Sequence, residues 1–211
     1  MARAAGDPER SYGGVPLTRR RAERRDRLLA AGVELFTSVG YQQTKITELC
    51  AAAGMSNRGF YQEFDTKEQL LLALHSRTNQ LAYDHVSQAL TALDVVDVQA
   101  RVGLLVDVFM AAVMSDPRLP RLNYVEAVGV SPALERQHEE WVGRWSALIE
   151  QEADQAAASG TAPRRDFHLT AIALVGAITG LLREWQAHAA HYPPAEIAAE
   201  AKAVILAAIT R

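Results

Sequence analysis

The chain has 211 residues, of which 49% are hydrophobic and 22% are charged, with a formal net charge of −3. This composition excludes an intrinsically disordered chain, and the length allows one large domain or two small ones. The single cysteine, Cys50, permits no internal disulfide and is typical of a reducing compartment. The longest uncharged apolar stretch, residues 167–182, is shorter than a membrane span, and the N-terminus lacks the apolar core of a secretory signal. We therefore expect a cytoplasmic globular protein without a membrane partner.

Residues 1–17 contain three glycines and two prolines with few apolar side chains, so we expect a disordered N-terminal arm. A first helix is predicted from about residue 19 to 39, and Gly40 follows as its stop signal. Six arginines occupy the first half of this helix: Arg19, Arg20, Arg21, Arg24, Arg25 and Arg27. The charge is unevenly distributed, because residues 1–67 hold 11 Lys/Arg against 8 Asp/Glu whereas residues 68–211 hold 11 against 17.

The basic first helix has two interpretations. The arginines could contact the phosphates of a nucleic acid, or the preceding arm could reach into a minor groove. Alternatively, Glu23 and Asp26 pair with the arginines along the helix, and the face is merely solvated. The motif that follows in the chain favours the first interpretation.

The segment from residue 44 to 70 predicts two short helices joined by a tight turn. Ile46, Leu49 and Ala53 share one helical face. Gly54 stands where the first of these helices must end, because glycine enters the left-handed region without a steric cost. Ser56 is the expected N-cap of the second helix. The spacing indicates a helix-turn-helix.

The second helix of this motif has an inner and an outer face. Phe60 and Phe64 lie four residues apart and are expected to face inward, whereas the polar residues Asn57, Arg58, Tyr61 and Gln62 project outward. An outer face of this kind suits the major groove of DNA, where Arg and Asn read base edges. The predicted contacts are bases for Asn57 and Arg58, and phosphates for Thr44, Lys45, Tyr61 and Lys67, with Gly59 allowing close approach.

Three runs of residues carry a resemblance to a known family: LLAAGVELF at 28–36 with Gly40 and Tyr41, the run from Ile46 to Ser56, and Phe60-Tyr61 with Phe64, Lys67 and Glu68. On these residues, the segment from about 28 to 72 resembles the DNA-binding domain of the tetracycline-repressor (TetR) family of bacterial transcription regulators. The sequence departs from that family's pattern at Lys45, where Ser or Thr is usual, and at Cys50, where Ala is usual. In addition, Gly59 lies one position later than the commoner glycine, whose place Arg58 takes. The resemblance covers about a quarter of the chain.

Helical patterns continue to the end of the chain. Thr66 and Gln69 form a predicted capping box that opens a long helix to about residue 93. Further helices are predicted near 97–115, 118–129, 132–159, 166–190 and 194–210, and no segment shows strand alternation with hairpin signals. We therefore predict an all-α fold: an arm at 1–17, a three-helix DNA-binding domain at 18–66, and a larger helical effector-binding and dimerisation domain at 67–211.

Bulky aromatic and sulfur-containing side chains are concentrated in the middle helices of the second domain. Trp141 and Trp145 lie four residues apart and so share a helical face. Composition alone is compatible with an ordinary core as well as with a pocket. The family resemblance implies an effector pocket here, and its predicted lining is Phe109, Met110, Tyr124, Trp141 and Trp145. We expect the ligand to be an apolar or aromatic small molecule.

The last two predicted helices carry the expected dimer interface. Residues 167–185 are apolar almost all the way round, so this helix must be covered on more than one side. The family resemblance implies that both helices pair with their copies across a two-fold axis. The predicted interface residues are Gly176, Gly180, Leu182, Val204, Ile205 and Ile209. A purely intramolecular core is the alternative.

Patterns that could support catalysis or metal binding are isolated. Glu135 and His138 have the spacing of a di-iron helical bundle, but such a site needs a second pair that the sequence lacks. His188 and His191 stand near a helix end, where histidine more often interacts with terminal carbonyls. Cys50 occupies a packing position inside the helix-turn-helix. We therefore predict no catalytic residues, no metal and no cofactor.

The sequence as a whole predicts a homodimeric transcriptional regulator, namely a repressor that a small-molecule effector releases from a palindromic operator in double-stranded DNA. The long helix from residue 67 to about 93 is the expected lever between the two activities. The alternative is a helical small-molecule-binding protein or enzyme in which the N-terminal helix-turn-helix is merely structural.

Overall fold

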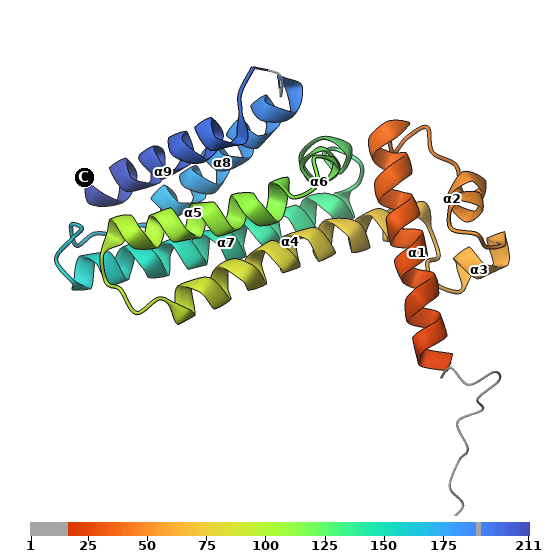
Figure 1. Ribbon diagram of the computed structural model, residues 1–211, viewed down its shortest axis with the longest axis horizontal. Helices are drawn as coiled ribbons and strands as arrows, with labels where there is room; N and C mark the ends of the chain where they lie inside the picture. The colour runs from red at the N-terminus through yellow and green to blue at the C-terminus, as the bar shows by residue number, and fades with distance from the viewer. Residues whose placement is uncertain (1–16, 189–190) are drawn as a thin grey trace, which may run out of the picture. The chain divides into compact units, whose positions relative to one another are not determined.

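The computed structural model describes residues 17–188 and 191–211, and every regular element in these ranges is helical (Figure 1). The all-α prediction is therefore confirmed. The predicted N-terminal arm lies, up to residue 16, outside the described residues. The chain divides into two compact units, one ending at Leu71 and the other comprising Leu72–Arg211.

The helices occupy the segments that the sequence indicates, with small differences at their ends. Their bounds are α1 Leu17–Ser38, α2 Ile46–Ala52, α3 Asn57–Tyr61, α4 Lys67–Ala92, α5 Val98–Met114, α6 Arg118–Arg121, a π-helical turn η1 Leu122–Glu126, α7 Pro132–Ala158, α8 His168–Ala187 and α9 Pro194–Thr210. Within the described residues, no single helix is long and apolar enough to cross a membrane, although α5 and the bent segment Arg118–Glu126 together satisfy that criterion by length and composition.

The N-terminal unit is built around a small aromatic and aliphatic core. Leu28, Phe36, Leu49 and Phe60 are completely buried, and they come from α1, α2 and α3. The turn between α2 and α3 depends on Gly54, whose φ of 62° lies in the left-handed region. These residues hold α2 and α3 in the predicted helix-turn-helix.

Side-chain caps begin the two helices that follow the turn. The Ser56 hydroxyl accepts a hydrogen bond from the backbone N–H of Gly59 at 3.3 Å, as the N-cap prediction requires. At the start of α4, the Thr66 hydroxyl accepts from the backbone N–H of Gln69 at 3.1 Å, and the Gln69 side chain accepts from the N–H of Asp65 at 2.9 Å. The predicted capping box is thus present, with its return bond one residue earlier.

The unit Leu72–Arg211 has a continuous apolar core that α4, α5, α7, α8 and α9 share. Helix α8 packs against α7 and α9, and α9 packs against α5. The Ser131 hydroxyl caps α7 by accepting from the N–H of Leu134 at 3.3 Å, and Pro132 takes the first helical position. This packing buries one face of every long helix in the unit.

The predicted helix at 118–129 is interrupted. It consists of the short helix α6 followed by η1, in which the N–H of Ala127 donates to the carbonyl of Leu122 at 3.0 Å across five residues. A π-helical turn is wider than an α-helical turn, and it often marks a functional site. Here it contributes the buried side chains of Asn123 and Tyr124.

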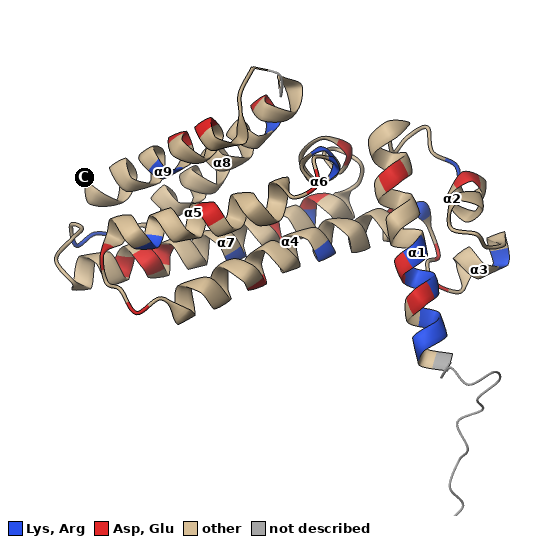
Figure 2. Cartoon of the chain, viewed as in Figure 1, with Lys and Arg blue, Asp and Glu red and all other residues tan. Residues whose placement is uncertain are grey.

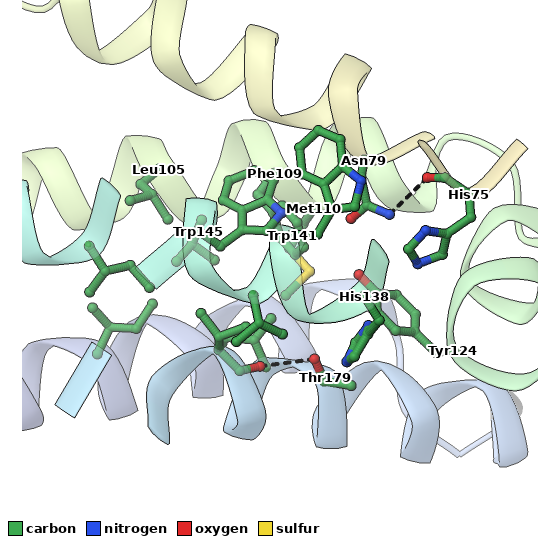
Figure 3. Close-up of a pocket in the computed structure, with 16 residues that line it drawn as sticks. His75, Asn79, Leu105, Phe109, Met110, Tyr124, His138, Trp141, Trp145 and Thr179 are labelled. Atoms are coloured by element: carbon green, nitrogen blue, oxygen red, sulfur yellow. Dashed lines mark hydrogen bonds between the residues drawn. The ribbon is translucent and has the colours of Figure 1, made fainter. Parts of the chain in front are cut away.

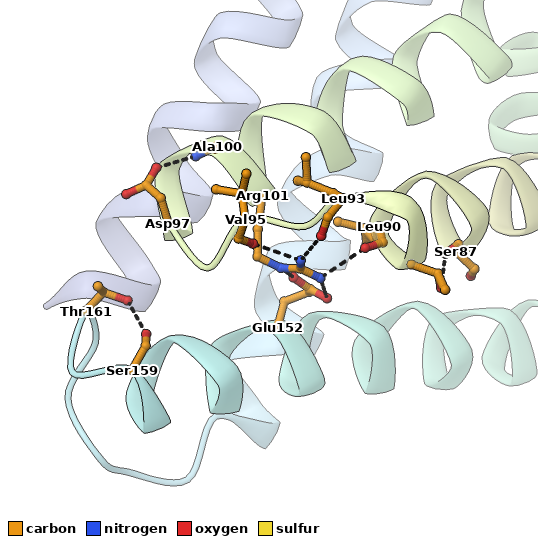
Figure 4. A network of polar contacts seen from close by, with 11 residues as sticks. Ser87, Leu90, Leu93, Val95, Asp97, Ala100, Arg101, Glu152, Ser159 and Thr161 are labelled. Atoms are coloured by element: carbon orange, nitrogen blue, oxygen red, sulfur yellow. Dashed lines mark hydrogen bonds and ion pairs between the residues drawn. The ribbon is translucent and has the colours of Figure 1, made fainter.

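A buried ion pair joins α5 to α7 and also ends α4 (Figure 4). Arg101 donates from Nε to Glu152 Oε2 at 2.6 Å and from Nη2 to Oε1 at 2.9 Å. The same guanidinium donates to the carbonyls of Val95 at 3.2 Å, Leu93 at 3.4 Å and Leu90 at 3.5 Å. Both charges are therefore surrounded by hydrogen-bonding partners, and the hydrogen bond to Glu152 raises the pKa of Arg101 above its ordinary value.

We predict that Arg101→Met lowers the free energy of unfolding by about 3–5 kcal/mol, because it leaves the Glu152 carboxylate buried without its partner. The double variant Arg101→Met/Glu152→Met should recover most of this loss. Arg118→Met, which removes an exposed ion pair with Asp116, is the matched control and should cost less than about 1 kcal/mol. Urea unfolding of the four proteins measures the differences. Equal losses for Arg101→Met and Arg118→Met would contradict the prediction.

Candidate functional site

Helix α3 presents a polar outer face and a buried apolar inner face. Phe60 is completely buried and Phe64 nearly so, whereas Asn57, Arg58, Tyr61 and Gln62 are exposed. The predicted division of the helix is therefore confirmed in the structure. Four polar side chains thus project from a segment whose position is set by its buried aromatic residues.

Gly59 lies on the same helix beside Met55. A Cβ added to Gly59 would lie 3.5 Å from the Met55 Cβ, which is an ordinary van der Waals contact. The fold of the chain itself therefore does not require glycine here. The predicted reason for this glycine, close approach of a bound partner, stays a prediction.

The side chains of Thr44 and Lys67, predicted to contact phosphates, form hydrogen bonds within the N-terminal unit. Thr44 is 2% exposed, and its hydroxyl donates to the carbonyl of Gly40 at 2.8 Å. Lys67 donates from Nζ to the carbonyls of Tyr41 at 2.6 Å and Thr44 at 2.8 Å. Burial lowers the pKa of Lys67 from its ordinary value. Both side chains stabilise the loop between α1 and α2, and a phosphate contact from either of them stays a prediction. Lys45, in contrast, is exposed.

The arginines of α1 are concentrated in its first half, as Figure 2 shows, and several of them hold the unit together. The Glu63 side chain is completely buried, and it accepts hydrogen bonds from Arg21 Nε at 3.2 Å and from Arg24 Nη2 at 3.3 Å. Arg25 donates to the Glu63 carbonyl at 3.2 Å and stacks over the ring of Phe64. Exposed Arg19 pairs with Glu23 at 3.0 Å, which is the alternative that the sequence left open. Much of this positive charge is thus already neutralised within the unit.

The second candidate site is a cavity within the unit Leu72–Arg211. All five predicted lining residues contribute to it: Phe109, Met110, Tyr124, Trp141 and Trp145. Helices α4, α5, α7, α8 and α9 and the turn η1 all supply part of its wall. Its volume, including the opening to solvent, is about 690 Å³. The space is narrow and mostly apolar, as in small-molecule sites.

The cavity is chemically divided along its length. In Figure 3, Leu105 and Trp145 lie toward one end, and the polar residues His75, His138, Tyr124 and Thr179 lie toward the other. The sequence gives no local signal for this polar group. His75 and His138 are 63 positions apart on α4 and α7, so no local spacing connects them. Only the packing of these two helices brings their rings to a centroid distance of 6.2 Å.

The hydrogen bonds of Gln137 define which ring nitrogen of His75 carries the proton. The Gln137 side-chain amide nitrogen donates to the Leu72 carbonyl at 3.0 Å and lies 2.8 Å from His75 Nδ1. Because a carbonyl can only accept, the nitrogen of this amide must face both groups, and His75 Nδ1 is the acceptor. The neutral ring therefore carries its proton on Nε2. Burial, followed by repulsion from His138, lowers the pKa of His75 to about 4.

Three residues of the predicted dimer interface are buried inside the single chain. Leu182 on α8 is 0% exposed, and Ile205 and Ile209 on α9 are 2% and 1% exposed, since α9 packs against α5 and α8. These three side chains already belong to the core of the single chain, and Val204 is also partly covered by it. The other two predicted residues, Gly176 and Gly180, are exposed.

The outer face of α8 remains apolar. A Cβ at Gly176 or Gly180 would meet no atom within 4 Å. On the same helix, Leu169 is 79% exposed and Ile172 is 39% exposed. Small residues beside exposed aliphatic residues give a face that another helix can approach closely.

The candidate metal and catalytic patterns find no structural support as clusters. Among the described residues, no group of three His, Cys, Asp or Glu side chains could hold a metal ion. Glu135 instead accepts a hydrogen bond from the backbone N–H of Gly129 at 2.9 Å. Cys50 is buried in the N-terminal unit, and burial raises the pKa of its thiol.

These features define a helical protein with an N-terminal helix-turn-helix and a second helical unit that encloses a cavity. Residues 28–74 match the model of a protein family described as bacterial regulatory proteins, tetR family. This segment of the chain is therefore a TetR-family DNA-binding segment. The resemblance that the sequence motifs carried is therefore confirmed.

Two curated relatives match about half of the chain. An uncharacterised helix-turn-helix transcriptional regulator of Bacillus subtilis, YdgC, is 29% identical over 106 residues, which are 48% of this chain and 53% of the relative. The transcriptional activator FasR of Mycolicibacterium smegmatis is 31% identical over 117 residues, which are 56% and 52% of the two chains. The chain thus spans about half the length of the curated relatives that it matches.

Solved structures resemble the chain over most of its length. The fatty acid degradation regulator FadR from Bacillus halodurans has a TM-score of 0.79 and 18% identity, with 87% of this chain and 94% of that chain covered. FadR from Bacillus subtilis, in complex with stearoyl-CoA, has a TM-score of 0.76 and 16% identity, with 87% and 97% covered. At these identities the likeness establishes the fold alone.

We predict that Lys67→Met weakens the N-terminal unit by about 1.5–3 kcal/mol, because it removes hydrogen bonds from a charged donor to loop carbonyls. Lys45→Met, at an exposed position on the same loop, should change stability by no more than about 0.5 kcal/mol. Hydrogen exchange of the α2 backbone amides measures both effects within this unit. If Lys45→Met proved the more disruptive change, the structural role of Lys67 would be wrong.

Proposed function

We propose that the chain is a homodimeric, sequence-specific DNA-binding repressor that a small-molecule effector releases from a palindromic operator. In this proposal residues 18–66 bind DNA, and residues 67–211 bind the effector and form the dimer. The observation that carries the proposal is the outer face of α3, where Asn57, Arg58 and Tyr61 are exposed on a helix that buried aromatic residues hold in place.

The chemistry of this face suits base recognition. Arginine forms paired hydrogen bonds with guanine, and asparagine forms them with adenine, in the major groove. We assign these roles to Arg58 and Asn57. Tyr61 and Lys45 are exposed and can donate to phosphates, and the N-terminus of α2 follows Lys45 directly. With Thr44 and Lys67 engaged inside the unit, this set of contacts is smaller than the sequence alone suggests.

One helix-turn-helix contributes limited base-specific energy, so such proteins usually bind as dimers to two half-sites about 34–36 Å apart. The outer face of α8 supports the dimer proposal. Gly176 and Gly180 leave room for a partner helix, and Leu169 and Ile172 offer apolar area beside them. In this arrangement the buried residues of α9 support α8 from behind.

The cavity supports the effector part of the proposal. Its aromatic lining and shortage of charged residues suit an apolar body, and FadR of Bacillus subtilis, similar in fold, was crystallised with stearoyl-CoA. We extend only the general expectation of an apolar effector to this chain. Catalysis is not part of the proposal, because the curated relatives are regulators and the residues lining the cavity include no nucleophile paired with a base.

Helix α4 connects the two activities along the chain. Its first residue, Lys67, bonds to the α1–α2 loop, and His75 and Asn79, further along the same helix, line the cavity. An effector releases DNA only if it binds the released conformation more tightly than the bound one. A coupling free energy of about 1–3 kcal/mol corresponds to a 5- to 150-fold fall in operator affinity. We propose that displacement of α4 supplies this coupling.

We predict that Arg58→Ala costs about 1–3 kcal/mol of binding free energy per half-site and relaxes the base preference at one position of each half-site. Operator DNA selected from a random pool, or DNA flanking the gene, serves as the probe in gel-shift titrations. Arg136→Ala on α7, also exposed, is the control and should bind like the wild type.

Unchanged affinity and sequence preference in Arg58→Ala would show that the recognition face is assigned wrongly. If the wild type bound no DNA at all, the alternative function would be favoured, namely a helical small-molecule-binding protein or enzyme with a structural helix-turn-helix.

We predict that Gly176→Glu converts the dimer to a monomer without unfolding it. The new side chain meets open space in the single chain, whereas in a dimer it would place a charge in an apolar interface. Ala147→Glu, on an exposed position of α7, is the control and should stay dimeric. Sedimentation at micromolar concentration measures the assembly, and circular dichroism checks the fold. A monomeric wild type, or a dimeric Gly176→Glu variant, would rule out this interface.

A further inference from the structure

A second, more polar compartment adjoins the apolar cavity. It is lined by His75, Asn123, Tyr124, Ala127, Val128, Leu134, Glu135, His138, Thr179 and Arg183. Four of these, His75, Tyr124, His138 and Thr179, also line the apolar cavity, so they form a shared wall between the two compartments. Its volume, including the opening to solvent, is about 510 Å³, compared with about 690 Å³ for the apolar cavity.

A buried polar atom in this compartment has no protein partner. Asn123 is 3% exposed, and its Oδ1 accepts no hydrogen bond from the described residues. His75 is 2% exposed, and the bond from Gln137 to Nδ1 leaves Nε2–H as the remaining donor of its ring. Buried polar groups are ordinarily hydrogen-bonded, and each exception calls for an explanation such as water or a ligand. The turn η1 contributes Asn123, and α4 contributes His75, so two separate elements supply these groups.

One cation stands at the same compartment. Arg183 on α8 is exposed and forms no ion pair with another described residue. The single carboxylate in the lining, Glu135, is oriented by its hydrogen bond to the backbone of Gly129. The apolar cavity contains neither Lys nor Arg in its lining. A ligand that spans both compartments therefore meets one cation, Arg183, and one carboxylate, Glu135, so the lining has no excess of positive charge to compensate a polyphosphate.

We propose that the two compartments form one site for an amphipathic monocarboxylic acid. The proposal rests on the proposed regulatory function, and it defines the effector's chemical class. The apolar body lies among Phe109, Trp141 and Trp145, and the carboxylate lies in the polar compartment. Arg183 and His75 Nε2–H donate hydrogen bonds to the carboxylate oxygens. Because Oδ1 of Asn123 has no partner among the described residues, rotation of the amide about χ2 can place its nitrogen there as a further donor.

Calorimetric titration of the full-length protein with three probes tests the proposal. Octanoate presents a carboxylate, octan-1-ol presents a neutral head on the same chain, and octanoyl-CoA presents a polyanionic thioester. We expect octanoate to bind at least about tenfold more tightly than either of the others, since charge-assisted hydrogen bonds to the carboxylate are stronger than neutral ones. Quenching of tryptophan fluorescence gives an independent binding curve, because Trp141 and Trp145 line the cavity.

Three variants distinguish the contribution of the ligand's head group to binding from that of its apolar body. Arg183→Met, at an exposed position, should weaken octanoate by about tenfold or more and leave octan-1-ol unchanged. Asn123→Leu should act in the same direction, with thermal unfolding as a check on its fold. Trp141→Ala should weaken both probes alike. Arg136→Met is the control, because this exposed arginine lies outside both linings.

The proposal is overturned if Arg183→Met binds octanoate as tightly as the wild type does, if octanoyl-CoA binds more tightly than octanoate, or if no probe binds. Gel shifts of the same preparations, with and without octanoate, keep this outcome separate from failure of the regulatory function. DNA binding without carboxylate selectivity rejects only the ligand class, whereas carboxylate selectivity without DNA binding rejects only the regulatory function.

Discussion

The satisfaction of buried polar groups is the constraint on which the rest of this structure depends. A charge or hydrogen-bonding group removed from water must find a partner, or it destabilises the fold by an amount comparable to a lost hydrogen bond or more. Glu63 meets this requirement through Arg21 and Arg24 in the N-terminal unit. Glu152 meets it through Arg101 in the unit Leu72–Arg211. These networks assign several basic residues to the fold rather than to a partner.

The same constraint separates structural from available side chains at both candidate sites. In the N-terminal unit, Lys67 donates its hydrogen bonds to loop carbonyls. Lys45 and the outer residues of α3 are exposed and remain available to a ligand. At the cavity, Gln137 donates to Nδ1 of His75, which leaves Nε2 of the same ring as a donor. Oδ1 of Asn123 has no partner among the described residues. Polar atoms left over in this way are the natural positions at which a ligand gains hydrogen bonds.

Helix α4 carries both polar groups that are bonded within the protein and polar groups that line the cavity. Lys67 at its start is bonded to the α1–α2 loop, His75 and Asn79 line the cavity, and the carbonyls near its end accept from Arg101. Its first residue is thus held within the N-terminal unit and its last turn within the unit Leu72–Arg211. In the proposed regulation the ligand contacts α4 between these two points, and a packed core favours discrete positions of a helix over gradual deformation.

The sequence by itself determined the local structure of this protein. The caps at Ser56, Thr66 and Ser131, the glycine turn at Gly54 and the apolar periodicities depend on neighbouring residues, so they were readable in the chain and place the helices correctly. The shared helical face of Trp141 and Trp145 was also readable in the chain, whereas the expectation that these residues line a cavity came from the family resemblance.

Tertiary structure alone decided which face of each helix is free and which polar groups meet. The sequence predicts Leu182, Ile205 and Ile209 at a dimer interface, yet the chain's own helices already bury these side chains. Thr44 and Lys67 were assigned to DNA, yet carbonyls within the same unit bind them. His75 and His138 meet only through the packing of α4 on α7. The sequence shows which apolar faces and charged side chains need a partner. The identity of that partner depends on contacts between residues distant in the chain.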